Sequence, residues 1–95
     1  MKPSTPTKSE ASVKIVVLHR GWVVVGEVHA EGNEVVIDKS SCIRRWGTTK
    51  GLGEIAQGGP TTKTQLDPMG TVRVHQLAVV LTLDCVSDKW ANSLK

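Results

Sequence analysis

Apolar residues occur along this chain in short runs, most of them rich in valine. The first two runs, Val13–Leu18 (VKIVVL) and Trp22–Val28 (WVVVGEV), are separated only by residues 19–21 (HRG). Valine is stiff at χ1 and packs well on a pleated surface, so both runs predict β-strands. The three residues between them are either a tight turn or a bulge in one long ribbon. Gly26 predicts a bulge or a close approach of another backbone.

A hairpin is expected next. Residues 30–34 (AEGNE) contain a glycine and an asparagine, both of which accept the positive φ that tight turns require. The returning strand is predicted over residues 34–39 (EVVIDK). Two serines at positions 40 and 41 are expected to break it, and a fourth, short strand is predicted over residues 41–46 (SCIRRW).

The middle of the chain, Gly47–Pro60, is predicted to be a glycine-rich loop. Within it, residues 52–57 (LGEIAQ) are expected to form one helical turn, closed by the Gly-Gly-Pro that follows. Residues 61–68 are polar and are expected to be irregular. Residues 67–70 (DPMG) predict a turn with proline at its second position.

The last third of the chain is again apolar. Residues 71–75 (TVRVH) alternate as in a strand, and residues 77–85 (LAVVLTLDC) predict a long final strand, buried on both faces at its centre. The main rival interpretation is a single helix over residues 72–83, against which the valines argue. Residues 86–95 are either a short helix that carries Trp90 or a frayed end.

Together these elements predict a mainly β chain, a small antiparallel barrel or sandwich of five to six short strands with one helical turn; α+β is the alternative. Residues 1–11, rich in Pro, Ser, Thr and Lys, predict a disordered tail. Residues 12–90 form the expected single domain, and residues 91–95 a C-terminal tail.

The core must be built without phenylalanine or tyrosine, from fourteen valines with Ile, Leu, Ala and Trp22. A domain this small buries only about 60% of the surface of its unfolded chain. Its stability alone is therefore expected to be modest. Small domains often gain stability by forming homo-oligomers, and the sequence is compatible with a homo-oligomer.

Charge and cysteine usage narrow the function classes. The net charge is +3, which permits an anionic partner but is mild for a duplex-DNA binder. No apolar leader precedes the first strand, and no apolar run approaches the ~20 residues of a membrane span. We therefore expect no membrane partner and a cytoplasmic protein with reduced thiols. A bridge between Cys42 and Cys85 stays open.

The segment from Cys42 to Pro60 concentrates the residue types that bind phosphate. Glycine amides can converge on an anion, an arginine can grip phosphate oxygens in a bidentate fork, and a tryptophan can stack on a base. The predicted ligand-binding residues are Arg44, Arg45, Trp46, Thr48, Thr49, Lys50, Gly51 and Gly53. The plain alternative is a loop in which Trp46 fills the end of the barrel and the arginines lie in solvent.

Known catalytic and cofactor motifs do not fit. The P-loop needs its lysine after the last glycine, whereas Lys50 precedes Gly51. Residues 51–56 match G-x-G-x-x-A, but the chain has no room for a βαβ unit. His19, His29 and His75 have no partner at a metal-ligand spacing, and there is no C-x-x-C. We expect no catalytic residue, no metal and no cofactor.

The run SCIRRWGTTKGLGEIA, followed by GGPT, LDP, GTVR and LDC, resembles a family of small bacteriophage and prophage proteins of unknown function. The resemblance covers residues 13–90. It implies a protein of the host cytoplasm that acts by binding. Two hypotheses follow: a binder of nucleotides or single-stranded nucleic acid, and a protein-interaction module that inhibits a host defence or replication protein.

Overall fold

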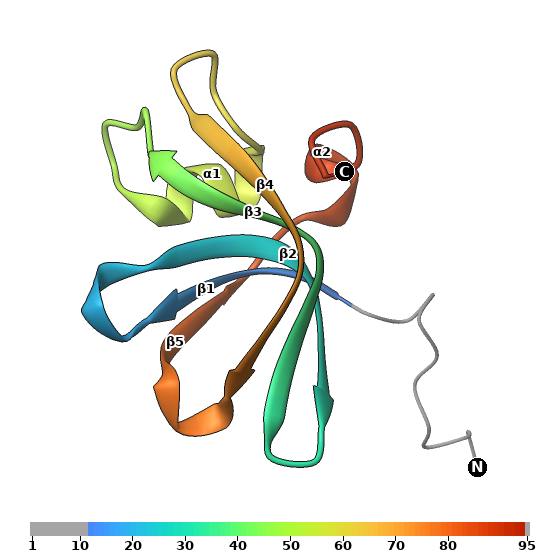
Figure 1. The fold of residues 1–95 in the computed structure, drawn as a ribbon. Helices are drawn as coiled ribbons and strands as arrows, with labels where there is room; N and C mark the ends of the chain where they lie inside the picture. The colour runs from blue at the N-terminus through green and yellow to red at the C-terminus, as the bar shows by residue number, and fades with distance from the viewer. Residues whose placement is uncertain (1–11, 95) are drawn as a thin grey trace, which may run out of the picture.

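The computed structural model describes residues 12–94, so the tail predicted for residues 1–11 lies outside the described residues. Within the described part, five strands form one antiparallel sheet in the order β4-β3-β2-β1-β5 (Figure 1). The strands are β1 (Ser12–Leu18), β2 (Val23–Glu31), β3 (Glu34–Arg45), β4 (Gln65–His75) and β5 (Val79–Asp84). The remaining elements are helices α1 (Leu52–Gly58) and α2 (Ser87–Trp90) and the 3₁₀ turns η2 (His19–Gly21) and η3 (Gln76–Ala78). The predicted mainly β class is confirmed.

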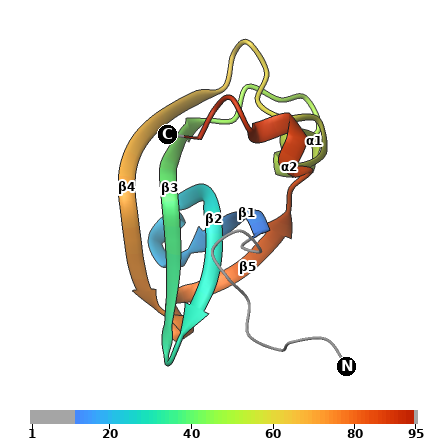
Figure 2. The same cartoon turned by 90° about the vertical axis from the view of Figure 1, so that its right-hand side faces the viewer.

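The sheet is strongly curved and open. The first four strands follow one another as a meander, and β5 returns to pair with β1. Figure 2 shows the long β3–β4 ribbon on one side and β1 and β5 on the other, with α1 and α2 together at one end. β4 and β5 are therefore the two edges of the sheet.

The curvature begins at Gly26, where the pairing of β2 with β3 shifts register. A Cβ on Gly26 would lie 2.6 Å from the side chain of Ile37 and 2.7 Å from the carbonyl oxygen of Asp38. Opposite this point Lys39 adopts a positive φ of 51°, rare for a residue with a side chain. The predicted bulge and close backbone approach are both confirmed.

The predicted break at Ser40 and Ser41 is wrong. β3 continues through both serines as one strand of 12 residues, and both are buried. Ser40 Oγ donates a hydrogen bond of 2.6 Å to the carbonyl oxygen of Gly70 on β4. The pairing of β3 with β4 shifts register at Lys39, between Ser40 and Ser41, and again after Ile43, so the strand bends without leaving the sheet. The separate strand predicted over residues 41–46 is the end of β3.

Both faces of the β1–β2 hairpin are buried, which explains its runs of valine. One face packs under the helices and forms what we call the helix-side core. The other face looks into the curve of the sheet and forms the inner core. The helix-side core contains Val13, Ile15, Val23, Val25, Ile43, Ile55, Ala56 and Trp90. The inner core contains Val16, Leu18, Val24 and Ile37.

Trp90 fastens the two helices to each other. Its side chain is fully buried, and its indole N–H donates a hydrogen bond of 3.0 Å to the carbonyl oxygen of Ile55 in α1. The backbone N–H of Val86 donates to the carbonyl oxygen of Ala56 at 2.9 Å. The helical turn predicted over residues 52–57 and the helix carrying Trp90 are both confirmed. Within the predicted C-terminal tail, Leu94 packs on the helix-side core.

The polar segment after α1 was predicted correctly only in part: residues 61–64 are irregular as expected, but β4 already begins at Gln65. Residues 67–70 do not form a turn but lie inside β4, where Asp67 pairs with Cys42 of β3. A proline is tolerated there because β4 is an edge strand, where a missing N–H need not break a ladder. The helix considered over residues 72–83 is also wrong, since the region forms the end of β4, η3 and β5.

Two predictions of burial were also wrong. β5 was expected to be buried on both faces, yet it is an edge strand in which Val80 is 57% exposed and Leu81 49% exposed. Trp22 was expected in the core but is 54% exposed beside the tight turn at residues 19–21. The buried tryptophan is Trp90 instead.

Replacing Trp90 by alanine should remove the largest side chain of the core. We expect Trp90→Ala to lower the free energy of unfolding by about 3–5 kcal/mol, because it leaves a cavity between α1 and the sheet. Trp22→Ala is the matched control and should cost less than about 1 kcal/mol, since that indole is half exposed. Urea unfolding followed by circular dichroism, at one protein concentration, measures both. Equal losses would contradict the assignment of Trp90 to the core.

Gly26→Ala tests the close approach of β2 and β3. The new methyl group would overlap Ile37 and the backbone of Asp38. We expect a loss of about 1–3 kcal/mol in the same unfolding measurement. Gly53→Ala is the control, because its Cβ would meet nothing within 4 Å. In the helix this change should stabilise by about 0.5–1 kcal/mol. A neutral Gly26→Ala would show that the bulge does not require glycine.

Candidate functional site

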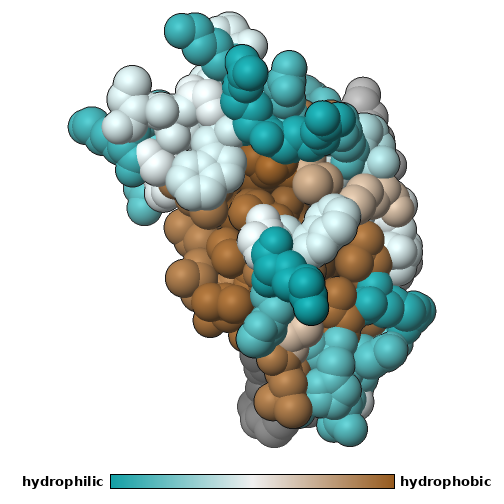
Figure 3. Space-filling view, turned by 60° about the vertical axis from the view of Figure 1, so that its left-hand side comes forward, coloured by the Kyte–Doolittle hydropathy of each residue, from teal (hydrophilic) through white to brown (hydrophobic). Residues whose placement is uncertain are grey.

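A shallow apolar hollow of about 370 Å³ opens on the side of the molecule that carries β5 and the loop before α1. Figure 3 shows apolar side chains gathered on this side in one area with hydrophilic residues around it. We call this feature the Trp46 hollow. Its lining residues are Val17, Val23, Trp46, Leu52, Gly53, Leu81 and Leu83. Trp46 is 42% exposed and Leu81 49% exposed, so both offer apolar surface to a partner.

The hollow exists because the helices cover only part of the sheet. Val17 pairs with Val23 on β2 and with Leu81 on β5, at the end of the face that forms the helix-side core. Helix α1 has only 7 residues, and Leu52 at its start is partly exposed. The apolar face of β5, β1 and β2 therefore continues beyond the helices, with Trp46 beside it.

Trp46 is held in place through its backbone. Its carbonyl oxygen accepts a hydrogen bond of 2.7 Å from Thr64 Oγ1, and the carbonyl oxygen of Gly47 accepts one of 2.9 Å from Thr61 Oγ1. Gly47 has a φ of 67°, and a Cβ there would lie 2.5 Å from the carbonyl carbon of Lys63. The loop is thus tied to the turn before β4, and only glycine fits at this contact.

Three backbone N–H groups of the predicted phosphate-binding loop, among them that of Gly51, are already paired. The backbone N–H groups of Thr49 and Lys50 both donate to one carboxylate oxygen of Glu54, at 3.2 and 3.1 Å. The N–H of Gly51 donates to Thr48 Oγ1 at 3.0 Å. The protein thereby supplies its own anion to this loop. A phosphate at the same amides would have to displace the carboxylate of Glu54.

The structure does not bring the predicted site residues into one cluster. Trp46 and Gly53 line the hollow, while residues 48–51 build the loop beside it. Arg44 forms an exposed ion pair of 3.0 Å with Asp67 on β4. Arg45 and Lys50 are exposed, and their side chains have no ion pair among residues 12–94.

Sequence reasoning missed most of the apolar lining of the hollow. Val17, Val23, Leu81 and Leu83 come from strands that appeared to be ordinary core. A signal was present, because the odd-numbered residues of β1 share one face and Val17 extends that face to the end of the strand. The pattern could not show that the covering helix stops short of Val17.

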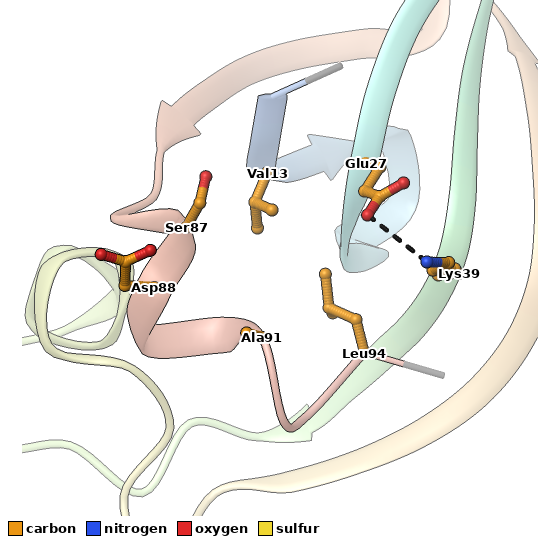
Figure 4. A pocket seen from close by; sticks show the side chains of 7 residues that line it. All are labelled: Val13, Glu27, Lys39, Ser87, Asp88, Ala91 and Leu94. Atoms are coloured by element: carbon orange, nitrogen blue, oxygen red, sulfur yellow. Dashed lines mark ion pairs between the residues drawn. The ribbon is translucent and has the colours of Figure 1, made fainter. Parts of the chain in front are cut away.

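Two other hollows are polar. One, of about 400 Å³, lies between α2 with the C-terminal segment and strands β2 and β3 (Figure 4). Its polar rim includes an ion pair of 3.8 Å between Lys39 and Glu27. The other, of about 290 Å³, holds His29, Glu31 and Arg73 on the sheet surface. Hydrogen bonds from His29 and Arg73 lower the pKa of Glu31. Lys39 and Glu27 pair in the first hollow, and Glu31 pairs with both His29 and Arg73 in the second.

The thiols are free, so no bridge joins Cys42 and Cys85. Burial raises the pKa of the Cys85 thiol to about 11, which leaves it protonated and unreactive at neutral pH.

Across residues 12–94, no three His, Cys, Asp or Glu side chains gather as metal ligands. In the same part of the chain, no helix combines the length and apolar character needed to cross a bilayer.

Comparison with known proteins gives no family. The chain matches no protein-family model, and no curated protein matches it. A function must therefore be argued from the Trp46 hollow and its surroundings.

Glu54→Ala tests whether this carboxylate organises the loop. We expect the amide protons of Thr49 and Lys50 to exchange faster with solvent, and the free energy of unfolding to fall by about 1–2 kcal/mol. Glu27→Ala removes a carboxylate from an ion pair with the largely exposed Lys39 and serves as the control, with a smaller loss. NMR hydrogen exchange and urea unfolding provide the two measurements. Unchanged exchange at Thr49 and Lys50 would contradict the proposed role of Glu54.

Proposed function

We propose that this protein acts by binding a partner protein, without catalysis, through the Trp46 hollow. The observation that carries the proposal is that a half-exposed tryptophan, Trp46, and a half-exposed leucine, Leu81, line one hollow together with the buried Val23. Buried aromatic anchors dominate many protein interfaces, and an exposed apolar area marks such sites. The resemblance to phage proteins suggests a host protein as partner, with inhibition of defence or replication as the outcome.

The charge of the domain favours a protein partner over nucleic acid. Residues 12–94 contain nine Lys and Arg and eight Asp and Glu, a formal net charge of only +1. Nucleic-acid binders gain most of their affinity from contacts between basic side chains and phosphates. Four of these nine cations, Lys14, Lys39, Arg44 and Arg73, already form ion pairs with carboxylates, which reduces the number available for such contacts.

A nucleotide or single-stranded nucleic acid is the second candidate. The observation in its favour is that Arg45 and Lys50, which have no ion pair in the described chain, adjoin Trp46 and the loop. A base could stack on the indole, for about 1–3 kcal/mol, while Arg45 grips a phosphate. Such a ligand would use side chains rather than the amides of residues 49–51, because Glu54 and Thr48 occupy those three amides.

Affinity capture from a bacterial lysate, followed by mass spectrometry, tests the proposal. The immobilised protein should retain a specific host protein that Trp46→Ala loses by roughly tenfold or more, since a truncated anchor residue typically costs ≥ ~2 kcal/mol. Trp22→Ala, an exposed tryptophan outside the hollow, should keep the partner. Because the contact is apolar, binding should survive a high-salt wash.

Two results would overturn this proposal. Capture that is equal for Trp46→Ala and Trp22→Ala would place any interface elsewhere. Retention of nucleotide or nucleic acid that is released by salt and lost in Arg45→Ala would support the second candidate instead.

A further inference from the structure

The two edges of the open sheet differ sharply in their protection against another strand. β4 contains Pro68, charged Asp67 and Arg73, and an irregularity at Gly70, whose φ is 73°. These are the devices by which natural proteins prevent edge-to-edge pairing. β5 has fewer of them: residues 79–83 (VVLTL) carry no charge, proline or glycine, while the strand ends at the charged Asp84 and its pairing with β1 shifts register beside Val80.

The open side of β5 presents free backbone groups. The N–H of Cys85 donates to the carbonyl oxygen of Val13 on β1 at 3.0 Å, so the backbone N–H and C=O groups of Leu81 and Leu83, which share this register, point towards β1. In an antiparallel strand the direction alternates, which turns the N–H and C=O of Thr82 to the open edge. Val80 and Thr82 are exposed on this strand, and no other strand in the described chain covers that side.

We propose that a second copy of this chain pairs with β5, antiparallel and about a two-fold axis, so that the two sheets become one. Residues 79–83 carry no charge and so meet no like-charge repulsion from the same residues of an identical strand. Two-fold pairing uses the same surface on both copies and closes without further growth. An exposed strand edge pairs readily with another strand, and a second copy of this chain is a partner that is always present.

The pairing also extends the binding surface. With a two-fold axis perpendicular to the sheet, the same face of the sheet lies on the same side of the dimer in both copies. Leu81 and Leu83, which line the Trp46 hollow from β5, would then adjoin their counterparts across the axis. The two hollows would form one apolar cleft with a Trp46 at each side. This last step rests on the proposed function, whereas the dimer rests on the strand edge alone.

Sedimentation equilibrium over a range of concentrations tests the dimer. We expect the wild-type chain of 10.2 kDa to sediment at twice its mass. Thr82→Lys should weaken the dimer by at least ~10-fold, because it places two like charges beside the axis. Thr82→Val keeps the shape and the N–H and should dimerise. Thr62→Lys, which adds the same charge to an exposed turn, should dimerise too.

Hydrogen exchange on the wild-type protein gives a second readout that needs no variant. The amide of Thr82 should exchange more slowly as protein concentration rises, since only the second copy protects it. A monomer at every concentration, a dimer that Thr82→Lys leaves intact, or exchange at Thr82 independent of concentration would each overturn the inference. Partner capture by a strictly monomeric protein would overturn the dimer while leaving the proposed function in place.

Discussion

The structure depends on covering both faces of the β1–β2 hairpin. Alternate valines of these strands point into two cores, so neither face can be left to water. The curved β3–β4 ribbon covers the inner face. The outer face needs a separate cover, which α1 and α2 provide. These helices have 7 and 4 residues, too short to be stable alone, and the buried contact from Trp90 to Ile55 holds them in place.

The loop before α1 follows from the same constraint. The chain must leave the end of β3, pass Trp46 and enter α1 over the outer face. Gly47 permits the close contact with the turn before β4, and Thr61 and Thr64 fix the carbonyl groups at the crossing. Glu54 then fixes the last turn of the loop from inside the helix. The glycine and threonine content that suggested an anion site is largely used to position Trp46.

Much of the fold could be predicted from the sequence where local pattern and tertiary environment agree. The valine runs predicted β1 and β2, and Gly26 predicted the bulge, because a residue without a side chain in a strand usually marks a close backbone approach. The short helices were predicted from a glycine stop and a tail with Trp90. In each case the deciding physics lies within a few residues of the sequence.

The failures have non-local causes. Nothing near Trp22 or Trp90 in the sequence shows which indole meets Ile55. The strand through Pro68 forms because β3 offers it a partner, not because its own residues favour a strand. The central run of β5 looks like a buried strand, and only the order of the sheet reveals it as an edge. For the candidate site, Trp46 was predicted from the sequence. The valines and leucines around it were not, because the hydrophobic pattern of a single strand does not distinguish a core residue from one that lines a hollow.

β5 combines exposed apolar side chains with an unpaired strand edge. Leaving a leucine in water rather than burying it forgoes about 1.5–3 kcal/mol, a large share of the stability of so small a domain. The other edge strand, β4, carries charged residues, a proline and a bulge, which prevent pairing with a further strand. Residues 79–83 of β5 carry no charge, proline or glycine, and the strand adjoins the one hollow, among those described for residues 12–94, with a mainly apolar lining. Exposed apolar surface, free strand edge and Trp46 lie together on one side, which argues that this side works when covered by another chain.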